Sequence, residues 1–271
     1  MIRNIKRRWV ETRVFSMLVT LALTSACSGS DEAEPRAKQA QAGELCPGGE
    51  TPKDECQAAE ERPAVEALID DMEDGDATIF AVSGRRGSWW TGGDDTVGAS
   101  MVPPKNGLAP PEAIAGSRCD SKRGTRVTGQ GFLDWGALLG VDMVYGVRSD
   151  NTDGNLPYDA SAYTGVEFWA RIGDTSTDRV RFAVSDVNNE PYGGVCTDND
   201  RLNEQCYDTF GTYLSGLSPE WRHYRIPFTS LTQRQFGYPA SAAATNAIFS
   251  VQFNFEPSSI FDFWVDDLAF Y

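Results

Sequence analysis

From residue 65 to residue 271, short runs of aromatic and β-branched residues recur between clusters of Gly, Pro, Asn and Asp. Runs of this length and make-up are typical of strands, and no segment keeps a helical period over three turns. The expected strands are 79–82, 88–91, 98–102, 125–132, 140–146, 165–171, 179–186, 207–214, 221–228, 247–255 and 260–271. The pattern predicts an all-β domain, an antiparallel two-sheet β-sandwich or jelly roll.

Two of these strands indicate which side faces the core. Because successive side chains of a strand point to opposite faces, we expect Val180, Phe182 and Val184 to be buried while Arg181 and Ser185 point outward. In the strand 247–255 the aromatic side chains share one face, and the other face carries Ser250, Gln252 and Asn254. A ladder of polar amides suits a sugar-binding face, but it is equally typical of any exposed sheet face.

The last expected strand has apolar residues on both faces and two adjacent carboxylates, Asp266 and Asp267. One of them should be buried, and a buried carboxylate is costly unless it is paired, hydrogen-bonded or bound to a metal. Near residue 68 a short apolar strand runs into a turn that contains Asp71, Glu73 and Asp76. If the first and last strands pair, Glu73 lies close to Asp266, and oxygen ligands of this kind suit Ca²⁺. The alternative is that these acids cap turns and meet arginines.

The first 26 residues have the organisation of an export signal. Five basic residues precede or flank the start of the apolar run 14–23, which is followed by Thr24-Ser25-Ala26-Cys27. This segment resembles a bacterial lipobox and implies lipid attachment at Cys27, the alternative being an ordinary secretory signal. The apolar run is too short for a spanning helix of about 20 residues.

The chain is acidic, with a formal net charge of −15, and loss of residues 1–26 would remove five basic residues and one acidic residue. Such a surface repels nucleic acid and anionic headgroups, so we expect no nucleic-acid partner. Membrane contact should come from lipid on Cys27. These features predict a protein of the bacterial cell envelope, anchored by lipid to the outer membrane and facing the periplasm or the exterior.

Five cysteines lie beyond the lipobox. Cys196 and Cys206 close a short polar loop and favour a disulfide, and Cys46 and Cys56 bracket a Pro/Gly segment that favours a second one. Cys119 would then be free or compete for one of these partners. None of the spacings is CxxC, so a zinc site is not expected.

Residues 28–63 are rich in Glu, Ala, Gln, Gly and Pro and almost free of large apolar side chains. A segment of this composition cannot build a core. We therefore interpret residues 27–64 as a disordered acidic tether between the lipid and one domain over residues 65–271.

Several motifs of that domain resemble the galactose-binding-like jelly rolls. They are Ile69-Asp70-Asp71-Met72-Glu73, Gly87-Ser88-Trp89-Trp90, Gly165-Val166-Glu167-Phe168-Trp169, Trp221-Arg222-His223-Tyr224-Arg225 and Phe263-Trp264-Val265-Asp266-Asp267-Leu268. Their order and spacing are similar to those of family-11-type carbohydrate-binding modules and of complex-I intermediate-associated protein 30 domains. The resemblance implies a two-sheet sandwich with a structural Ca²⁺ between the acid of the first strand, Glu73, and the aspartate of the last, Asp266. Asp71 and Asp76 are further oxygen donors within reach.

The resemblance also implies sugar binding on a concave sheet face. Aromatic rings stack on sugar C–H groups, and planar polar side chains bond the hydroxyls. The candidate ligand-binding residues are Trp135, Tyr145, Tyr192, Tyr213 and His223, with Arg181, Arg225, Gln252 and Asn254 as polar partners. One of the adjacent Trp89 and Trp90 should be exposed, because neighbours on a strand point to opposite faces.

These observations predict a non-catalytic, lipid-anchored envelope protein that binds a poly- or oligosaccharide. The sequence has no GxSxG or HExxH motif and a single histidine, His223, so nucleophilic or multi-histidine metal catalysis is not indicated. One alternative is a structural or adhesion lipoprotein that binds a protein partner with the same sandwich. Another is a glycoside hydrolase, which needs two facing carboxylates.

Overall fold

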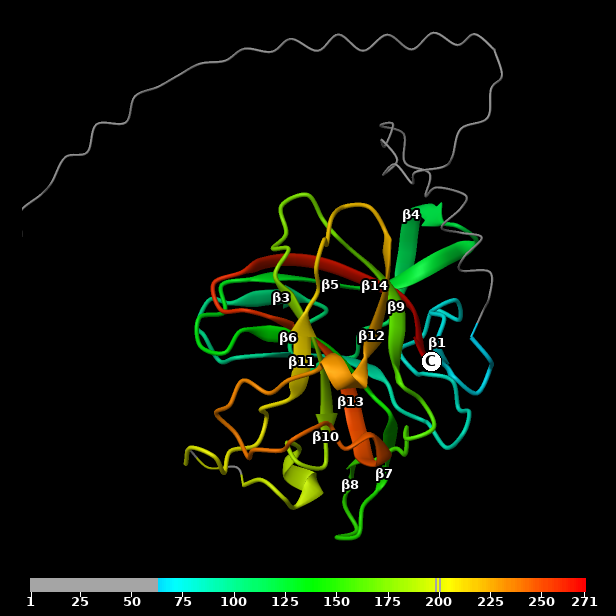
Figure 1. The fold of residues 1–271 in the computed structure, drawn as a ribbon. Helices are drawn as coiled ribbons and strands as arrows, with labels where there is room; N and C mark the ends of the chain where they lie inside the picture. The colour runs from blue at the N-terminus through cyan, green and yellow to red at the C-terminus, as the bar shows by residue number, and fades with distance from the viewer. Residues whose placement is uncertain (1–62, 198, 200) are drawn as a thin grey trace, which may run out of the picture. The chain divides into compact units, whose positions relative to one another are not determined.

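A computed structural model describes residues 63–197, 199 and 201–271, which fold into two main antiparallel sheets (Figure 1). The first sheet has the strand order β12-β9-β14-β5-β3, with β1 added to β14 and β4 added to β5. Its strands are β1 (Leu68–Asp70), β3 (Ser100–Val102), β4 (Glu112–Arg118), β5 (Ser121–Gln130), β9 (Gly165–Ile172), β12 (Arg222–Pro227) and β14 (Ile260–Phe270). The longest of these, β14, lies between β9 and β5.

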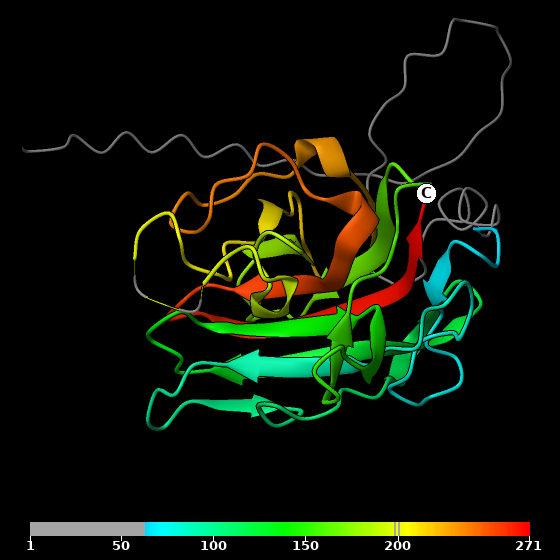
Figure 2. The same cartoon turned by 90° about the horizontal axis from the view of Figure 1, so that it is seen from below.

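The second sheet has the order β11-β10-β13-β6-β2. Its strands are β2 (Trp89–Gly93), β6 (Ala137–Asp142), β10 (Val180–Asp186), β11 (Phe210–Tyr213) and β13 (Ile248–Phe255). A separate hairpin pairs β7 (Val144–Val147) with β8 (Asp153–Leu156), and three 3₁₀ turns are η1 (Pro191–Gly193), η2 (Phe228–Ser230) and η3 (Thr245–Ala247). In Figure 2, β13 (orange) crosses over β14 (red), so the two sheets lie face to face. The predicted all-β, two-sheet antiparallel sandwich is confirmed.

The core between the sheets is made of aromatic side chains from facing strands. Phe253 of β13 has its ring 5.0 Å from Phe168 of β9 and 5.0 Å from Phe263 of β14, and Phe255 stacks on Phe261 at 4.2 Å. All five rings are at most 2% exposed. The predicted alternation therefore holds for β10 and for residues 250–255 of β13, because every second side chain is needed to fill this layer. At the start of β13 a register shift places Ile248 in the core cluster in place of Phe249, so the prediction that the aromatic side chains of this strand share one face is wrong at Phe249.

The side chains of β14 exchange faces partway along the strand. Val265 points into the core and Asp266 points to the outer face, but the pairing with β9 shifts register between Asp266 and Ala269. Asp267 sits at φ 48° in this bulge, which is the left-handed region that aspartate tolerates. The extra residue turns Leu268 back into the core. Regular alternation along the whole of this expected strand would put Trp264, Asp266 and Leu268 on one face, and that expectation is wrong beyond Asp266.

The first and last strands pair as predicted, with Leu68 opposite Ala269. At the end of β1, the buried Asp70 carboxylate accepts hydrogen bonds from the indole N–H of Trp89 at 2.7 Å and from the Met72 amide at 3.0 Å. Trp89 belongs to the second sheet, so this carboxylate links the two layers.

Three differences from the expected strands concern edges and loops. Residues 79–82 form no strand, because Ile79 packs into the core from a loop that turns at residues 80–85. The expected strand 140–146 is divided between β6 and β7, and β4 and the β7-β8 hairpin were not predicted.

Within the described residues, no helix is long and apolar enough to cross a membrane.

The Cys196–Cys206 disulfide is confirmed, with an S–S distance of 1.95 Å. Cys119 also forms a disulfide, which removes the alternative of a free thiol. The predicted Cys46–Cys56 pair, the lipidation site Cys27 and the predicted signal and tether (except for residues 63 and 64) lie outside the described residues.

Burial of the Asp70 carboxyl group allows a prediction of how the stability of the fold depends on pH. Burial raises the pKa of Asp70 to about 7, although hydrogen bonds from Met72 and Trp89 partly oppose this shift. A carboxyl with a raised folded-state pKa stabilises the fold below its unfolded pKa of about 4, and this contribution is lost as the pH rises through about 7. We expect urea unfolding to show falling stability from pH 4 to pH 8, and a shallower fall in Asp70→Asn.

The control is Asp174→Asn, because Asp174 is exposed in a turn and its replacement should leave the pH profile unchanged. The pH profile of Asp70→Asn is compared with the profile of the parent protein, since burial also raises the pKa values of Asp142 and Asp266 to about 7. Identical slopes in Asp70→Asn and in the parent would contradict the assignment.

Candidate functional site

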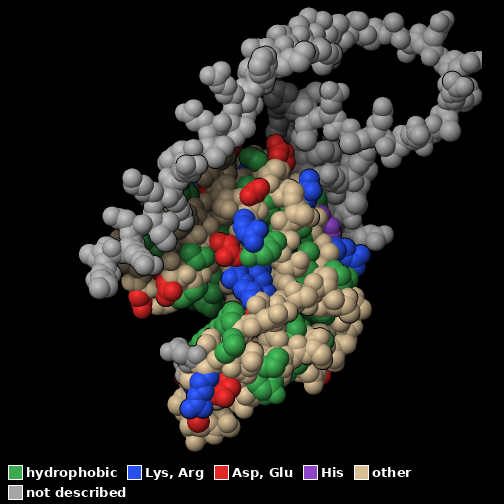
Figure 3. All heavy atoms as spheres, turned by 60° about the vertical axis from the view of Figure 1, so that its left-hand side comes forward, with side chains coloured by type: hydrophobic (Ala, Val, Ile, Leu, Met, Phe, Trp, Pro, Cys, Tyr) green, Lys and Arg blue, Asp and Glu red, His purple; other side chains and the backbone are tan. Residues whose placement is uncertain are grey.

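The outward face of the second sheet forms the floor of an open cleft of about 800 Å³. The floor carries Arg181 and Ser185 of β10, Leu138 of β6 and a polar row from β13. That row is Ser250, Gln252 and Asn254, which sequence alternation placed on this face. Figure 3 turns this side of the molecule forward and shows basic side chains gathered near its centre, with acidic and hydrophobic side chains beside them. The size suits a small ligand or a short polymer segment.

Trp90 provides an aromatic surface in the floor of the cleft. Strand pairing places Ala183, Gln252, Gly140 and Trp90 in one row across β10, β13, β6 and β2. A Cβ at Gly140 would lie 2.8 Å from two atoms of the Trp90 indole, so the missing side chain lets the ring lie over β6. Trp90 is only partly buried, whereas Trp89 is fully buried. Trp90 is therefore the member of the pair that reaches the outer face, but it is only partly exposed, whereas the prediction expected an exposed tryptophan.

Two buried aspartates hold the loops that form the rims of the cleft. The Asp94 carboxylate, 3% exposed, accepts hydrogen bonds from the amides of Thr96, Asp134 and Gly136 at 2.9 to 3.0 Å. Burial raises the pKa of Asp94, but the hydrogen bonds from Thr96, Gly136 and Asp134 outweigh burial and lower it to about 2. This ionised carboxylate fixes the loop that presents Trp135, which is 49% exposed at the rim.

The opposite rim is built in the same way. Asp208, 1% exposed, accepts hydrogen bonds from the amides of Arg234, Phe236 and Gly237 at 2.7 to 3.0 Å. The neighbouring Tyr207 is 58% exposed and lines the cleft. Each rim is thus held by one carboxylate that accepts three backbone hydrogen bonds, a strong charge-assisted arrangement.

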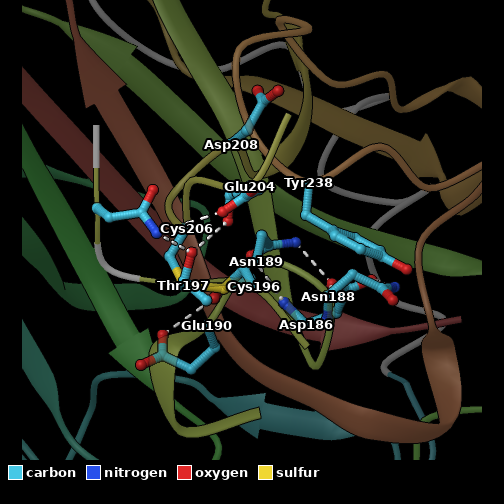
Figure 4. The surroundings of a disulfide bond; sticks show 12 residues. Asp186, Asn188, Asn189, Glu190, Cys196, Thr197, Glu204, Cys206, Asp208 and Tyr238 are labelled. Carbon is cyan, nitrogen blue, oxygen red and sulfur yellow. Dashed lines mark hydrogen bonds between the residues drawn. A yellow bond between two sulfur atoms is a disulfide. The ribbon is translucent and has the colours of Figure 1, made fainter. Parts of the chain in front are cut away.

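The disulfide Cys196–Cys206 braces the loop next to this second rim (Figure 4). The amide of Thr197 donates to the Glu204 carbonyl at 2.8 Å, and the amide of Cys206 donates to the Thr197 carbonyl at 3.2 Å. Asn199 and Gln205 of this loop line the cleft. The predicted disulfide therefore shapes a wall of the site.

One end of the cleft is acidic. Glu190 lines it, with the Ser185 hydroxyl 3.2 Å from its carboxylate, and Asp142 lies close by on β6. Burial raises the pKa of Glu190, and burial raises the pKa of Asp142 to about 7, with the negative charge of Glu190 adding to the shift. Hydrogen bonding from Trp90 and Asn155 opposes the shift of Asp142 only in part.

Of the nine predicted ligand-binding residues, the cleft brings together Trp135, Arg181, Gln252 and Asn254. Tyr213 lies next to it on β11, where its hydroxyl donates to Glu256. The sequence analysis did not single out Trp90 as the member of its pair that faces the cleft, and it did not name Asn106, Asn155 or Tyr207. The register of β2 against β6 decides which tryptophan faces outward, and sequence alone does not show that register.

The other four predicted ligand-binding residues lie outside the cleft. His223 and Arg225 belong to β12 in the first sheet, so they are on the opposite side of the sandwich. Arg225 pairs with Glu167 at 3.0 Å. Tyr145 is on the β7-β8 hairpin, and the Tyr192 ring is covered by the Arg148 guanidinium at 3.8 Å. The sequence alone did not show that β12 lies in the first sheet, which is why His223 and Arg225 were included.

The predicted calcium ligands lie close together, but they already have other partners. Ser121 has its hydroxyl 2.7 Å from the Asp266 carboxylate and 3.0 Å from the Glu73 carboxylate. The Glu73 carboxylate also accepts the amides of Lys122 and Arg123. Asp71 and Asp76 accept amides of their own turns, as the alternative interpretation predicted. These bonds engage both oxygens of Asp266 and one oxygen each of Glu73, Asp71 and Asp76.

The positive charge beside Asp266 is the guanidinium group of Arg118. The Arg118 guanidinium, 2% exposed, donates to Asp266 at 2.9 Å and also to Asp267. Burial raises the pKa of Asp266 to about 7, and the charge of Arg118 opposes that shift. Residues 63–197, 199 and 201–271 contain no group of three or more His, Cys, Asp or Glu side chains arranged to hold a metal. The residues present therefore fit an arginine better than Ca²⁺, and calcium binding stays a prediction.

Comparison with known proteins gives a class for the second half of the chain. Residues 142–271, just under half of the sequence, match the family model described as carbohydrate binding domain 30. None of the curated proteins compared matches the chain. The matched segment includes β10, β11 and β13 of the cleft floor.

Several solved structures of low sequence identity are similar to this chain. A family 11 carbohydrate-binding module of a cellulosomal cellulase from Clostridium thermocellum is 14% identical, with a TM-score of 0.43, and the match covers 77% of this chain and 95% of that one. A family 30 carbohydrate-binding module is 15% identical, with a TM-score of 0.49 and coverages of 77% and 88%. A family 30 module of a cellulosomal cellulase from Clostridium thermocellum is 16% identical, with a TM-score of 0.40 and coverages of 72% and 96%. At these values the likeness carries no conclusion about ligands.

The fold and the family match together confirm the resemblance to jelly-roll carbohydrate-binding modules. Modules of this kind are non-catalytic binding domains. The described part of the chain is therefore a two-sheet sandwich, of which residues 142–271 match a carbohydrate-binding family.

Arg118 provides a direct test of which cation neutralises Asp266. We expect Arg118→Ala to lower the free energy of unfolding by about 3–5 kcal/mol, because it leaves a buried carboxylate without its partner. The control Arg201→Ala should change it by less than about 0.5 kcal/mol, since Arg201 is 78% exposed. EDTA should leave the melting temperature of the parent protein unchanged. A melting temperature that falls in EDTA and recovers when calcium is added would assign the site to Ca²⁺ instead.

Proposed function

We propose that the cleft binds a segment of a poly- or oligosaccharide. The observation that carries this proposal is the row across the floor in which the Trp90 ring lies over Gly140 beside the Gln252 amide. Sugar rings present C–H faces that stack on aromatic rings, and their hydroxyls need donors and acceptors in fixed positions. An indole next to an amide offers both.

The rest of the lining supports a hydroxyl-rich ligand. Six side-chain amides face the cleft, from Asn106, Asn155, Asn199, Gln205, Gln252 and Asn254. Two partly exposed aromatics, Trp135 and Tyr207, lie at the rims. Planar amides can donate and accept at once, which matches vicinal hydroxyl groups. An apolar ligand would leave these groups unpaired, at a cost for each one.

In the complete protein, this module would be held at the bacterial envelope. Export and lipid attachment at Cys27 rest on the lipobox-like segment, and residues 27–64 would act as the tether. In this proposal the protein is non-catalytic and presents its cleft to glycan near the outer membrane, from the periplasmic or the outer side. Binding of a protein partner through the same cleft is the alternative outcome of the binding test.

Replacement of the aromatic surface tests sugar binding. We expect Trp90→Ala to weaken binding of soluble polysaccharides at least about 10-fold, because a central aromatic contact contributes about 2 kcal/mol or more. Trp135→Ala should weaken it less, since Trp135 is at the rim. Affinity electrophoresis or calorimetry with β-glucans, xylan and peptidoglycan fragments measures the change.

The matched control is Tyr145→Ala, an exposed aromatic on the hairpin outside the cleft, which should leave binding unchanged. If wild-type protein binds none of a broad glycan panel, the proposal fails and a protein partner becomes the better hypothesis. Equal binding by the wild type and Trp90→Ala would place the sugar elsewhere.

Lipid anchoring is tested independently of the cleft. We expect the full-length protein expressed in a bacterial host to partition into the detergent phase of Triton X-114, and Cys27→Ser to move it to the aqueous phase, because the lipid is its proposed means of membrane attachment. Ser30→Ala, a substitution in the same segment that keeps Cys27, is the control and should leave the partitioning unchanged. Unchanged partitioning of Cys27→Ser would rule out the lipobox interpretation.

A further inference from the structure

Arg181 is a buried cation in the floor of the cleft. Its side chain starts from β10, opposite Tyr213 of β11 and Asn254 of β13. A Cβ at Gly211 would lie 2.7 Å from the guanidinium carbon, so the side chain crosses β11 where that glycine leaves room. Arg181 is 4% exposed and lines the cleft.

The guanidinium is only partly satisfied by the protein. Nη1 donates to the Thr209 hydroxyl at 3.1 Å, and Nη2 donates to the carbonyls of Thr209 and Thr232 at 2.8 Å each. A guanidinium has five N–H groups, so two of them, including the one on Nε, have no acceptor in the described part of the chain. No carboxylate of residues 63–197, 199 and 201–271 forms an ion pair with Arg181.

The surrounding charges leave this cation without a counter-ion. Arg234 is paired with Glu256 at 2.8 Å, and Glu256 also accepts the Tyr213 hydroxyl. Asp208 is engaged by three backbone amides of its rim loop. Arg179 lies over the Tyr213 ring at 3.9 Å. This end of the cleft therefore holds two arginines, Arg181 and Arg234, and two engaged carboxylates, in a protein of net charge −15.

The electrostatic state of Arg181 agrees with this geometry. Burial and the nearby positive charge of Arg234 together lower the pKa of Arg181 to about 10, although the more distant charges of Asp208 and Glu256 partly oppose this shift. A buried charge without a partner is unfavourable, and a ligand that supplies the opposite charge removes that cost when it binds. Arginine is also the side chain that best matches the two oxygens of a carboxylate.

We propose that the cleft takes an acidic saccharide, whose carboxylate pairs with the free N–H groups of Arg181 at the end of the floor next to Asn254. This inference rests on the proposed function and specifies the class of sugar. Uronic acid residues, in which a carboxylate replaces the primary alcohol of a hexose, have the required chemistry.

The opposite end of the floor restricts the pattern of charge along the glycan. Ser185 is four residues from Arg181 on β10, which is about 13 Å at the usual rise of a strand. There the cleft is lined by Glu190 and Ser250, with Asp142 beside them. A second carboxylate would meet these acids, and like charges repel. The site therefore favours a mixed glycan with spaced uronic acids over a homopolymer of uronic acid.

The experiment is a calorimetric comparison of the mature chain with two matched probes, an oligosaccharide that carries one glucuronic acid and the same oligosaccharide after carboxyl reduction. At about 20 mM salt we expect the acidic probe to bind about tenfold more tightly. At about 300 mM salt this preference should shrink, while binding of the reduced probe stays the same, because salt screens the charge pair. Equal affinity for both probes at low salt would overturn the inference and leave the proposed function standing. No binding of either probe or of a wider glycan panel would overturn both.

Substitutions of Arg181 then test whether this residue causes the preference for the acidic probe. Arg181→Gln should abolish the preference for the acidic probe, and Arg181→Lys should keep part of it, because the charge remains but the two-pronged geometry is lost. The control Arg222→Gln removes an exposed arginine of the first sheet and should keep the full preference. Arg181 also holds Thr209 and Thr232, so each variant is first compared by its affinity for the reduced probe. A preference that survives in folded Arg181→Gln would overturn the inference.

Discussion

The alternation of side chains along Val180–Ser185 of β10 and Ser250–Phe255 of β13 is the constraint from which the site follows. The inner side chains of these strands, with Phe253 among them, fill the aromatic layer between the sheets. That requirement places Arg181, Gln252 and Asn254 on the outer face together, since a shift by one residue would expose the core and bury the polar row. Hydrophobic packing thus sets the orientation of the floor of the cleft, although the residues that form this floor contribute little to the core.

The walls depend on a different kind of interaction. Two buried aspartates, Asp94 and Asp208, hold the rim loops by accepting backbone amides. On the other sheet, Arg118 and Ser121 perform a comparable task for the buried Asp266. The molecule therefore uses hydrophobic packing for its layers and carboxylate hydrogen bonds for the loops and strand ends.

Much of the fold could be predicted from the sequence, because period-two alternation is a local signal. It gave the two-sheet class, the faces of β10 and β13 and the pairing of the first and last strands. It failed at Asp267, where one bulge reverses the facing of β14, and at His223 and Arg225, whose strand belongs to the other sheet. Bulges and sheet membership depend on long-range pairing. The identity of the cation beside Asp266 depended on Arg118, which is 148 residues away in sequence.

The most direct test of the central claim is an NMR titration of the mature protein with a bound oligosaccharide, followed at the indole N–H signals. The account predicts that the signals of Trp90 and Trp135 shift in a saturable manner, while those of Trp169, Trp221 and Trp264, which cluster on the outer side of the other sheet, stay in place. Shifts confined to this second group would place the sugar on the wrong side of the sandwich and contradict the account.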